Sequence, residues 1–228
     1  MTAPELVVGL DVPALQDARR LIAILRSAVS RFKVGLELFT AAGPAAVEAV
    51  QAAGAEVLLD LKLHDIPHTV AGAVRSAARL GVALLTLHLD GGETMVRAAV
   101  DAAGEAGAGL RLLGITRLTS RPESEAPAAS VVDAAVRAAE WGVHGVVAAV
   151  PESPGIRAAC PAGFLIVCPG IRPAGTERGD QARVATPAAA AAAECDLVVV
   201  GRPIIRAFDP LRAARALLDE IAAVAAEV

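Results

Sequence analysis

The feature that most constrains the fold is a regular alternation between short apolar runs and longer alanine-rich stretches. Eight runs have the length and composition of buried strands: Leu6–Asp11, Phe32–Leu36, Val57–Leu63, Ala83–Leu89, Leu110–Thr116, Gly145–Val150, Phe164–Cys168 and Leu197–Val200. The stretches between them have helical spacing and are punctuated by Gly or Pro; examples are Pro13–Val29, Pro44–Ala53, Pro67–Leu80, Glu93–Ala103 and Pro210–Ala226. Strands that alternate with helices predict repeated βα units and a parallel sheet.

Eight such units in 228 residues favour one α/β fold, the closed (β/α)8 TIM barrel, over an open doubly wound sheet. No Gly-x-Gly-x-x-Gly follows the first strand, which argues against a dinucleotide-binding Rossmann domain. No linker or second domain is indicated, so we expect residues 1–228 to form a single barrel domain. The alanine run Ala188–Ala193 is predicted to be helical because alanine has the highest helix propensity.

Composition excludes several partner classes. A net charge of −4 provides no basic surface for nucleic acid, and no apolar run is long enough to cross a membrane. The first residues lack the basic and apolar segments of a signal peptide. The three cysteines, Cys160, Cys168 and Cys195, have no paired spacing, which indicates reduced thiols rather than disulfides or a zinc site. We therefore expect a cytoplasmic protein with neither nucleic-acid nor membrane partners.

Charged residues interrupt the most apolar of the strand-like runs. Within Val57–Pro67, Asp60 and Lys62 lie two residues apart and Asp65 follows just past the strand. Because strand side chains alternate, Asp60 and Lys62 should share one face while the neighbouring leucines face the helices. Charges in such a run are costly unless they neutralise one another or perform chemistry.

The distribution of lysine supports a chemical role. Of the 21 basic residues only Lys33 and Lys62 are lysine, and the other 19 are arginine. Both lysines lie in strand-like runs, Phe32–Leu36 and Val57–Leu63. An ammonium group can give up its proton and a guanidinium practically cannot, so we interpret the two lysines as functional.

A phosphate site is predicted at the end of the barrel where strands seven and eight finish. Active sites of this fold lie at the C-terminal ends of the strands, and the last two loops commonly bind phosphate. Here these loops carry Gly170 with Arg172 and Gly201 with Arg202. Glycine lets backbone N–H groups approach an anion, and arginine can bind phosphate oxygens in bidentate fashion. Gln181 opens the helical stretch between the two loops and adds a side-chain amide.

Three motifs together resemble those of one enzyme family. Asp60-x-Lys62-x-x-Asp65-Ile66-Pro67, Pro169-Gly170-Ile171-Arg172-Pro173 and Val200-Gly201-Arg202-Pro203-Ile204 are similar to the orotidine 5'-phosphate decarboxylase family, in its short free-standing bacterial form. The likeness covers almost the whole chain. It implies a (β/α)8 barrel, a homodimer, and conversion of orotidine 5'-monophosphate to UMP and CO2, the last step of de novo UMP biosynthesis. It also implies that no metal or organic cofactor is needed.

The resemblance assigns roles to individual positions. The catalytic charge network would be Lys33, Asp60, Lys62 and Asp65, with Lys62 as proton donor to C6 of the pyrimidine and Asp65 reaching into the partner's site. Lys33 and Asp60 would also contact substrate. Asp11 and Thr69 would contact the ribose or neighbouring groups, and Thr119 with Ser120 the pyrimidine. The phosphate would be held by Arg172, Gln181, Gly201 and Arg202.

Two other functions are compatible with parts of the pattern. A sugar-phosphate decarboxylase or aldolase-like synthase of the same superfamily shares Asp-x-Lys-x-x-Asp but uses Mg²⁺. Those relatives carry an acidic residue where this chain has Lys33, and a cation there opposes metal binding. A phosphate-binding barrel without catalysis would leave the charges of the third strand without a purpose. No convincing metal-ligand spacing is present, so no metal is assigned, and the roles of His64, His68 and His88 stay open.

Overall fold

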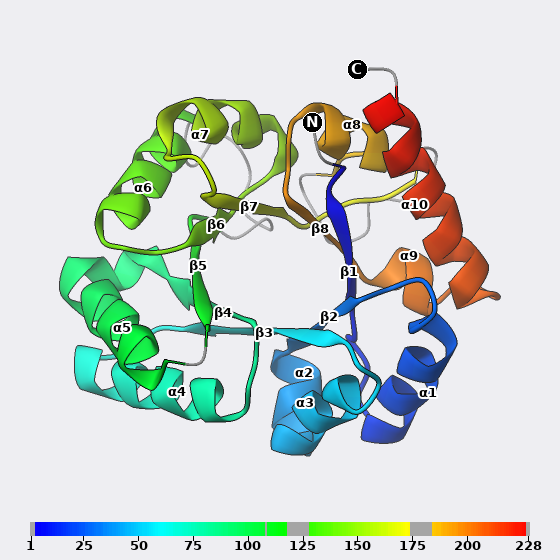
Figure 1. Cartoon of the computed structure of the whole chain (residues 1–228), viewed down its shortest axis with the longest axis horizontal. Coiled ribbons are helices and arrows are strands. Elements are labelled where there is room, and N and C mark those ends of the chain that lie inside the picture. The colour runs from blue at the N-terminus through cyan, green and yellow to red at the C-terminus, as the bar shows by residue number, and fades with distance from the viewer. Residues whose placement is uncertain (1–2, 108, 118–127, 174–183, 227–228) are drawn as a thin grey trace.

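A closed barrel of parallel strands forms the centre of the molecule (Figure 1). The computed structural model describes residues 3–107, 109–117, 128–173 and 184–226. The strands follow one another around the barrel in chain order and are β1 (Glu5–Gly9), β2 (Arg31–Gly35), β3 (Glu56–Leu63), β4 (Leu84–His88), β5 (Arg111–Ile115), β6 (Gly145–Val147), β7 (Leu165–Cys168) and β8 (Leu197–Val200). The (β/α)8 prediction is confirmed, and each predicted strand overlaps an observed one.

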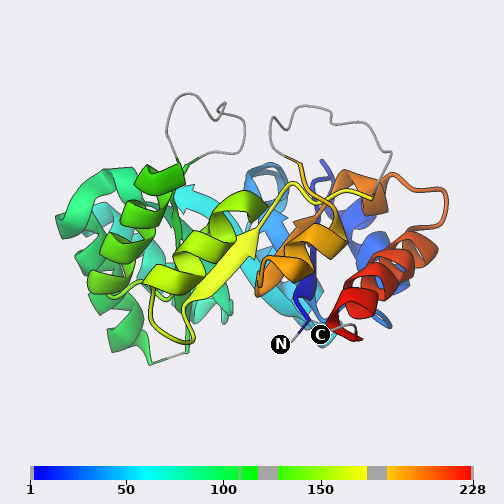
Figure 2. The ribbon, with the colours of Figure 1, turned by 90° about the horizontal axis from the view of Figure 1, so that it is seen from above.

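Helices surround the barrel on the outside (Figures 1 and 2). They are α1 (Leu15–Leu25), α2 (Leu36–Ala42), α3 (Pro44–Gln51), α4 (Pro67–Arg79), α5 (Gly92–Ala106), α6 (Ala128–Glu140), α7 (Ser153–Ala159), α8 (Pro187–Ala192), α9 (Arg202–Ile205) and α10 (Pro210–Ala226), with short 3-10 turns η1 (Leu89–Gly91) and η3 (Val150–Glu152). The alanine run predicted to be helical lies largely in α8. The strand predicted to reach Leu36 ends at Gly35, because α2 begins there without an intervening turn.

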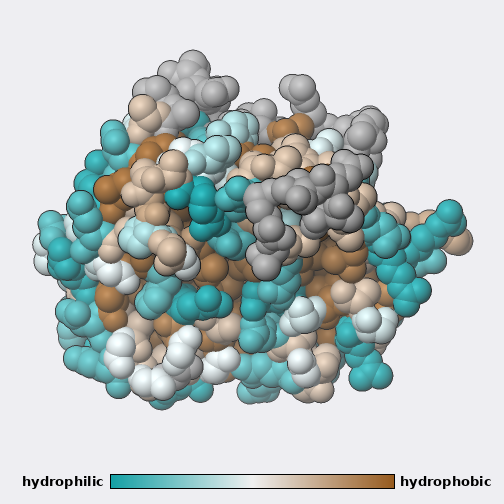
Figure 3. Space-filling view, turned by 45° about the horizontal axis from the view of Figure 1, so that its top comes forward, coloured by the Kyte–Doolittle hydropathy of each residue, from teal (hydrophilic) through white to brown (hydrophobic). Residues whose placement is uncertain are grey.

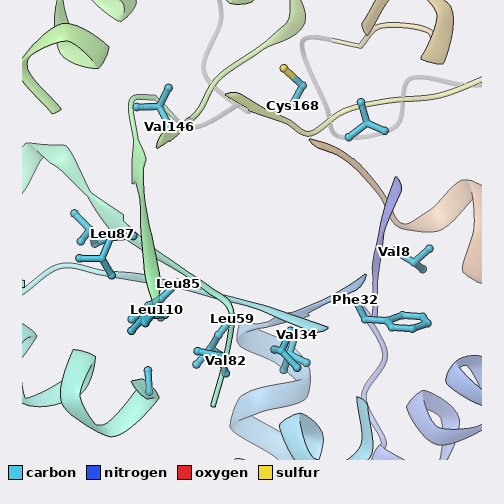
Figure 4. Close-up of a cluster of buried hydrophobic side chains, with 14 of the residues drawn as sticks. Val8, Phe32, Val34, Leu59, Val82, Leu85, Leu87, Leu110, Val146 and Cys168 are labelled. Atoms are coloured by element: carbon cyan, nitrogen blue, oxygen red, sulfur yellow. The ribbon is translucent and has the colours of Figure 1, made fainter. Parts of the chain in front are cut away.

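Two apolar layers stabilise the barrel. Side chains that point outward, such as Val8, Phe32 and Leu59, are fully buried against the helices (Figure 4). A smaller cluster fills the inside of the barrel with one residue from each of six strands: Val7, Leu58, Leu84, Leu113, Val167 and Leu197. In the space-filling view hydrophilic residues predominate at the periphery (Figure 3). Burial of this apolar area is the main force that favours the fold.

The N-terminal end of the barrel is tied together by a charged cluster. Arg31 on β2 donates from Nη1 to Glu5 Oε2 on β1 at 2.6 Å and from Nε to Glu56 Oε2 on β3 at 3.0 Å. The Arg31 side chain is only 10% exposed, so the two carboxylates compensate a largely buried charge.

Within the described ranges, no helix combines the length and apolarity needed to cross a membrane.

One irregularity interrupts the ladder between β3 and β4. Leu59 is paired with Leu85, but the next paired residues are Leu63 and Leu87, so the register shifts between them. Residues 60–62 of β3 therefore bulge opposite a single residue of β4. Bulges of this kind redirect side chains and are frequent beside active sites.

Candidate active site

A cavity of about 240 Å³ lies within the C-terminal end of the barrel. Every strand, or the residues just after it, contributes to its wall. Leu58, Val147, Val167 and Val199 give it apolar surface, whereas the charged groups come from β2 and β3 and from the segments after β1, β5, β7 and β8. The pocket therefore combines an apolar surface with several convergent polar groups, the usual composition of a small-molecule site.

Four charged side chains of alternating sign form a row along one side of this cavity. Lys33 Nζ lies 2.8 Å from Asp11 Oδ1 and 3.6 Å from Asp60 Oδ2. Lys62 Nζ lies 2.7 Å from Asp60 Oδ1. The Lys33 and Asp60 side chains are each 13% exposed, whereas Lys62 is 29% exposed. Lys62 is thus the more accessible of the two ammonium groups.

The two central charges stabilise each other's ionised form. Burial alone would lower the pKa of Lys33, but Asp11 and Asp60 outweigh it and the pKa is raised. Burial would likewise raise the pKa of Asp60, but Lys33 and Lys62, together with hydrogen bonds from Lys62 and Thr86, lower it. Both groups are therefore charged at neutral pH, and opposite charges at short range outweigh desolvation for both.

The bulge in β3 brings Asp60 and Lys62 together. Lys62 has a φ of 50°, in the left-handed region that residues with a side chain seldom adopt. Such a conformation costs of the order of 1–2 kcal/mol relative to the right-handed one. The backbone N–H of Lys62 donates to Thr86 Oγ1 at 2.9 Å, so the distorted strand retains a partner for this donor.

Two glycines leave room for the row of charges. A Cβ atom added at Gly35 would lie 2.8 Å from Lys33 Nζ and 3.1 Å from Asp11 Oδ1. One added at Gly201 would lie 3.1 Å from Asp11 Oδ2. The ion pair of Lys33 with Asp11 thus occupies space that any larger residue at these two positions would reduce.

Arginines lie on the side of the cavity formed by β7 and β8. Arg172 and Arg202 both line it, as do Gly170 and Gly201. The backbone after β7 is held by two hydrogen bonds, from Arg172 N–H to Ala185 O at 2.9 Å and from Ala185 N–H to Gly170 O at 3.2 Å. The cavity therefore has alternating charges on one side and two guanidinium groups on another. The guanidinium groups could bind an anionic group of a ligand, and the alternating charges would then face another part of that ligand.

Most of the residues singled out in the sequence lie around this cavity. Those that line it are Asp11, Lys33, Asp60, Lys62, Arg172, Gly201 and Arg202. Asp65 and Thr69 do not: both are exposed, and Asp65 Oδ1 accepts a hydrogen bond from Ile66 N–H at 2.6 Å. Thr119, Ser120 and Gln181 lie outside the described residues.

Two polar residues that the sequence reasoning missed also line the cavity, Thr86 on β4 and Arg117 just after β5. Arg117 Nη2 lies 3.3 Å from Glu152 Oε1, and both side chains are almost completely buried. Glu152 Oε2 also accepts a hydrogen bond from Ala149 N–H at 2.7 Å. A single hydroxyl within the apolar run of β4 is a signal of the same kind as the charges in β3, and it could have identified Thr86.

Two histidines, His64 and His88, lie near this rim. The rings of His64 and His88 lie 5.4 Å apart. Burial, with the neighbouring His64 as the next cause, lowers the pKa of His88. Within the described ranges no group of three or more His, Cys, Asp or Glu side chains could hold a metal ion.

Comparison with known proteins identifies the family. The sequence pattern of the Orotidine 5'-phosphate decarboxylase / HUMPS family matches residues 4–217. The chain belongs to this family. The orotidine 5'-phosphate decarboxylase of Nitratidesulfovibrio vulgaris is 48% identical to this chain over 231 residues. The alignment covers 96% of this chain and 98% of that protein. The orotidine 5'-phosphate decarboxylase of Thermobifida fusca is 49% identical over 230 residues, 97% of each chain.

Two solved structures agree with the fold. The crystal structure of orotidine 5'-phosphate decarboxylase from Lactobacillus acidophilus has a TM-score of 0.79 and 32% identity, and it covers 96% of this chain and 99% of that one. An uncharacterized conserved protein from Geobacillus kaustophilus has a TM-score of 0.80 and 34% identity, with 95% and 99% coverage. The resemblance drawn from the sequence motifs is therefore confirmed at the level of family and fold.

The lowered pKa of Asp60 predicts how stability depends on pH. Its contribution is fully present above the usual carboxyl pKa and is lost as pH falls through the lower folded-state value. Each unit of lowering is equivalent to about 1.4 kcal/mol of unfolding free energy. In urea denaturation at pH values from about 6 down to 3, the difference between wild type and Asp60→Asn should become less favourable to wild type below about pH 4. If the difference in unfolding free energy between wild type and Asp60→Asn did not change with pH, the lowered pKa of Asp60 would be contradicted.

Proposed function

We propose that this chain decarboxylates orotidine 5'-monophosphate to UMP and CO2, with Lys62 as the proton donor to C6. The observation that supports this most directly is that the Lys62 ammonium group, 2.7 Å from Asp60, lines the same cavity as Arg172 and Arg202. A nucleotide whose phosphate lies against the arginines could extend its base toward Lys62. Family membership supports the same reaction.

The chemistry requires stabilisation of a carbanion. When the bond from C6 to the carboxylate breaks, its electron pair stays on C6, where no adjacent group can accept it. Enzymes lower barriers by roughly 8–23 kcal/mol, and a reaction of this kind belongs toward the demanding end. A fixed ammonium group beside C6 provides preorganised charge where negative charge develops. Lys62 then transfers a proton to C6, which forms the C6–H bond of UMP, and the neutral amine regains a proton from water.

Asp60 and Lys33 prepare Lys62 for this role. The lowered pKa of Asp60 keeps it anionic, so its carboxylate would repel the substrate carboxylate placed beside it. This repulsion disappears as CO2 leaves, which favours the transition state relative to bound substrate. Lys33, held between Asp11 and Asp60, keeps the carboxylate of Asp60 in place.

The phosphate end supplies binding energy remote from the reacting carbon. Arg172, Arg202 and the backbone at Gly201 would hold the phosphate, together with Gln181. Contacts to a group that does not react can be used to orient the base and to offset its placement beside Asp60.

We also propose that the active unit is a homodimer in which Asp65 and Thr69 serve the partner's site. Both residues are exposed on the segment that joins β3 to α4 and begins α4, and neither lines the cavity of its own subunit. Two large apolar side chains that follow the neighbouring strands β2 and β3 support an interface at this end of the barrel, since Leu36 is 56% exposed and Ile66 is 66% exposed.

The remaining features of the proposal concern the whole protein. Residues 1–228 would form one catalytic domain that uses no cofactor and works in the cytoplasm. The three free cysteines are compatible with a reducing compartment. A Mg²⁺-dependent decarboxylase or synthase is less compatible, because the Lys33 ammonium lies against Asp11 and Asp60, where a cation would have to bind. Activity unaffected by EDTA is expected of the proposed enzyme, and loss of activity would favour the Mg²⁺-dependent alternative.

Lys62→Ala should abolish turnover while nucleotide binding survives. The ammonium group is needed for the carbanion and the proton, whereas the phosphate contacts remain. Decarboxylation is followed by the absorbance change of orotidine 5'-monophosphate, and UMP affinity by calorimetry. We expect a loss of kcat of at least about a thousandfold, as for removal of a key electrostatic group. A near-normal rate would exclude Lys62 as the acid.

Arg202→Ala tests the other end of the cavity. Because its guanidinium would contact only the phosphate, UMP affinity should fall by about tenfold or more, the equivalent of one charge-assisted hydrogen bond, while uridine affinity stays unchanged. Arg206→Ala, which removes an arginine that does not line the cavity, is the matched control. Equal losses for UMP and uridine would place the phosphate elsewhere.

Subunit mixing tests the shared site. Lys62→Ala and Asp65→Asn should each be inactive or nearly so, because every site lacks one required residue. A mixture allowed to exchange subunits should regain up to about one quarter of wild-type activity, because half the dimers then contain one intact site. Sedimentation equilibrium provides the mass. A monomer, or a dimer whose activity is not restored by mixing, would contradict the proposal for Asp65.

A further inference from the structure

Thr86 faces the bulge of β3 that carries Asp60 and Lys62. Paired residues on either side are Leu59 with Leu85 and Leu63 with Leu87. Three residues of β3, 60–62, thus lie opposite Thr86 alone. The Thr86 residue is 1% exposed, so its hydroxyl group has little access to bulk water and must find partners in the protein.

The hydroxyl group of Thr86 joins Asp60 to Lys62. Thr86 Oγ1 donates to Asp60 Oδ1 at 2.9 Å and accepts from the Lys62 backbone N–H at 2.9 Å. Asp60 Oδ1 also accepts from Lys62 Nζ at 2.7 Å. A hydroxyl has one proton to donate and lone pairs to accept, and here both capacities are used on the same two residues. The three side chains and the Lys62 amide form a closed ring.

This ring also explains how Lys62 keeps its unusual backbone. At φ 50° the residue is in a sparsely populated region, and such conformations persist only where the surroundings hold them. In a regular parallel ladder a backbone carbonyl of β4 would accept from this part of β3. In this structure the side chain of Thr86 provides the acceptor. The Thr86 hydroxyl therefore replaces the backbone carbonyl that would accept from Lys62 N–H in a regular ladder.

We propose that Thr86 is a positioning residue, whose hydroxyl group fixes the Asp60 carboxylate and the Lys62 backbone so that the ammonium group is directed at the reacting carbon. The inference rests on the proposed decarboxylase function. Thr86 acts through Asp60 and Lys62 and takes no part in the proton transfer. The hydroxyl group is the essential feature, because valine has nearly the same shape but can neither donate nor accept.

The test compares Thr86→Val with Thr86→Ser in the full-length protein. The valine variant should lower kcat for orotidine 5'-monophosphate by about a hundredfold, the effect expected when a catalytic group is displaced by about 1 Å. UMP affinity should change by less than about threefold, because the phosphate contacts are distant. The serine variant keeps the hydroxyl group and should retain kcat within about fivefold of wild type.

Thr116→Val is the matched control. Thr116 follows the neighbouring strand β5, and its hydroxyl donates to Val147 O at 2.9 Å without contact to the charged row. The same substitution there removes a partly buried hydrogen bond of the same length, and kcat should be unchanged. If Thr86→Val does not fold, Thr86→Ala also lacks the hydroxyl group and is subject to the same expectations.

The pH profile gives a readout that a purely structural role would not change. Asp60 is faced by Lys33 from β2, by Lys62 from its own strand and by His88 at the end of β4, with Asp11 beyond Lys33. All of these remain in the valine variant. Loss of the Thr86 hydrogen bond removes one cause of the lowered pKa of Asp60, so the acidic limb of kcat should move to higher pH.

The outcomes separate this inference from the function on which it rests. If wild type does not decarboxylate orotidine 5'-monophosphate, the proposed function fails. A crystal structure of Thr86→Val then decides the positioning role: a displaced Asp60 carboxylate or a relaxed Lys62 backbone supports it, and an unchanged ring overturns it. If wild type is active, a wild-type kcat for Thr86→Val, or an equal loss in Thr86→Ser, overturns the inference.

Discussion

The ion pairs around Asp60 are the interaction on which the rest of the site depends. A carboxylate that is 13% exposed lies between two ammonium groups, and its low pKa follows from them. Without Lys33 and Lys62, burial would favour the protonated acid. The same attraction keeps Lys33 charged inside an apolar barrel. Opposite charges thus make each other's burial possible, and the proposed catalysis uses the charge concentrated in this way.

The barrel places this cluster through features of its backbone. β3 bulges where Asp60 and Lys62 occur, and glycines at 35 and 201 leave space beside Lys33 and Asp11. At the opposite end, Arg31 ties the first three strands together. Stability and function are therefore separated along the barrel axis, as is general for this fold. The strands are fixed at their N-terminal ends, while their C-terminal ends carry the charged groups.

Much of this could be predicted from the sequence, because strand and helix periodicity are local signals. The apolar runs predicted the strands, and the restriction of lysine to Lys33 and Lys62 indicated the charged row. The register shift at 60–62 could not be predicted, since it depends on how β3 pairs with β4. The lone hydroxyl of Thr86 in an apolar strand was a visible signal, but its contacts with Asp60 and Lys62 could not be predicted, because they depend on that shift. Asp65 does not line the cavity, and the role proposed for it depends on a second copy of the chain, which the sequence of one chain does not describe.

The account depends most directly on where the Lys62 ammonium lies relative to the base of a bound nucleotide. A crystal structure with UMP bound would measure the distance from Lys62 Nζ to pyrimidine C6. We expect these two atoms to be about 3–3.5 Å apart, the separation of groups poised to react, with the phosphate against Arg172 and Arg202. A nucleotide bound with its phosphate on these arginines but with Lys62 Nζ turned away from C6 would contradict the proposed mechanism.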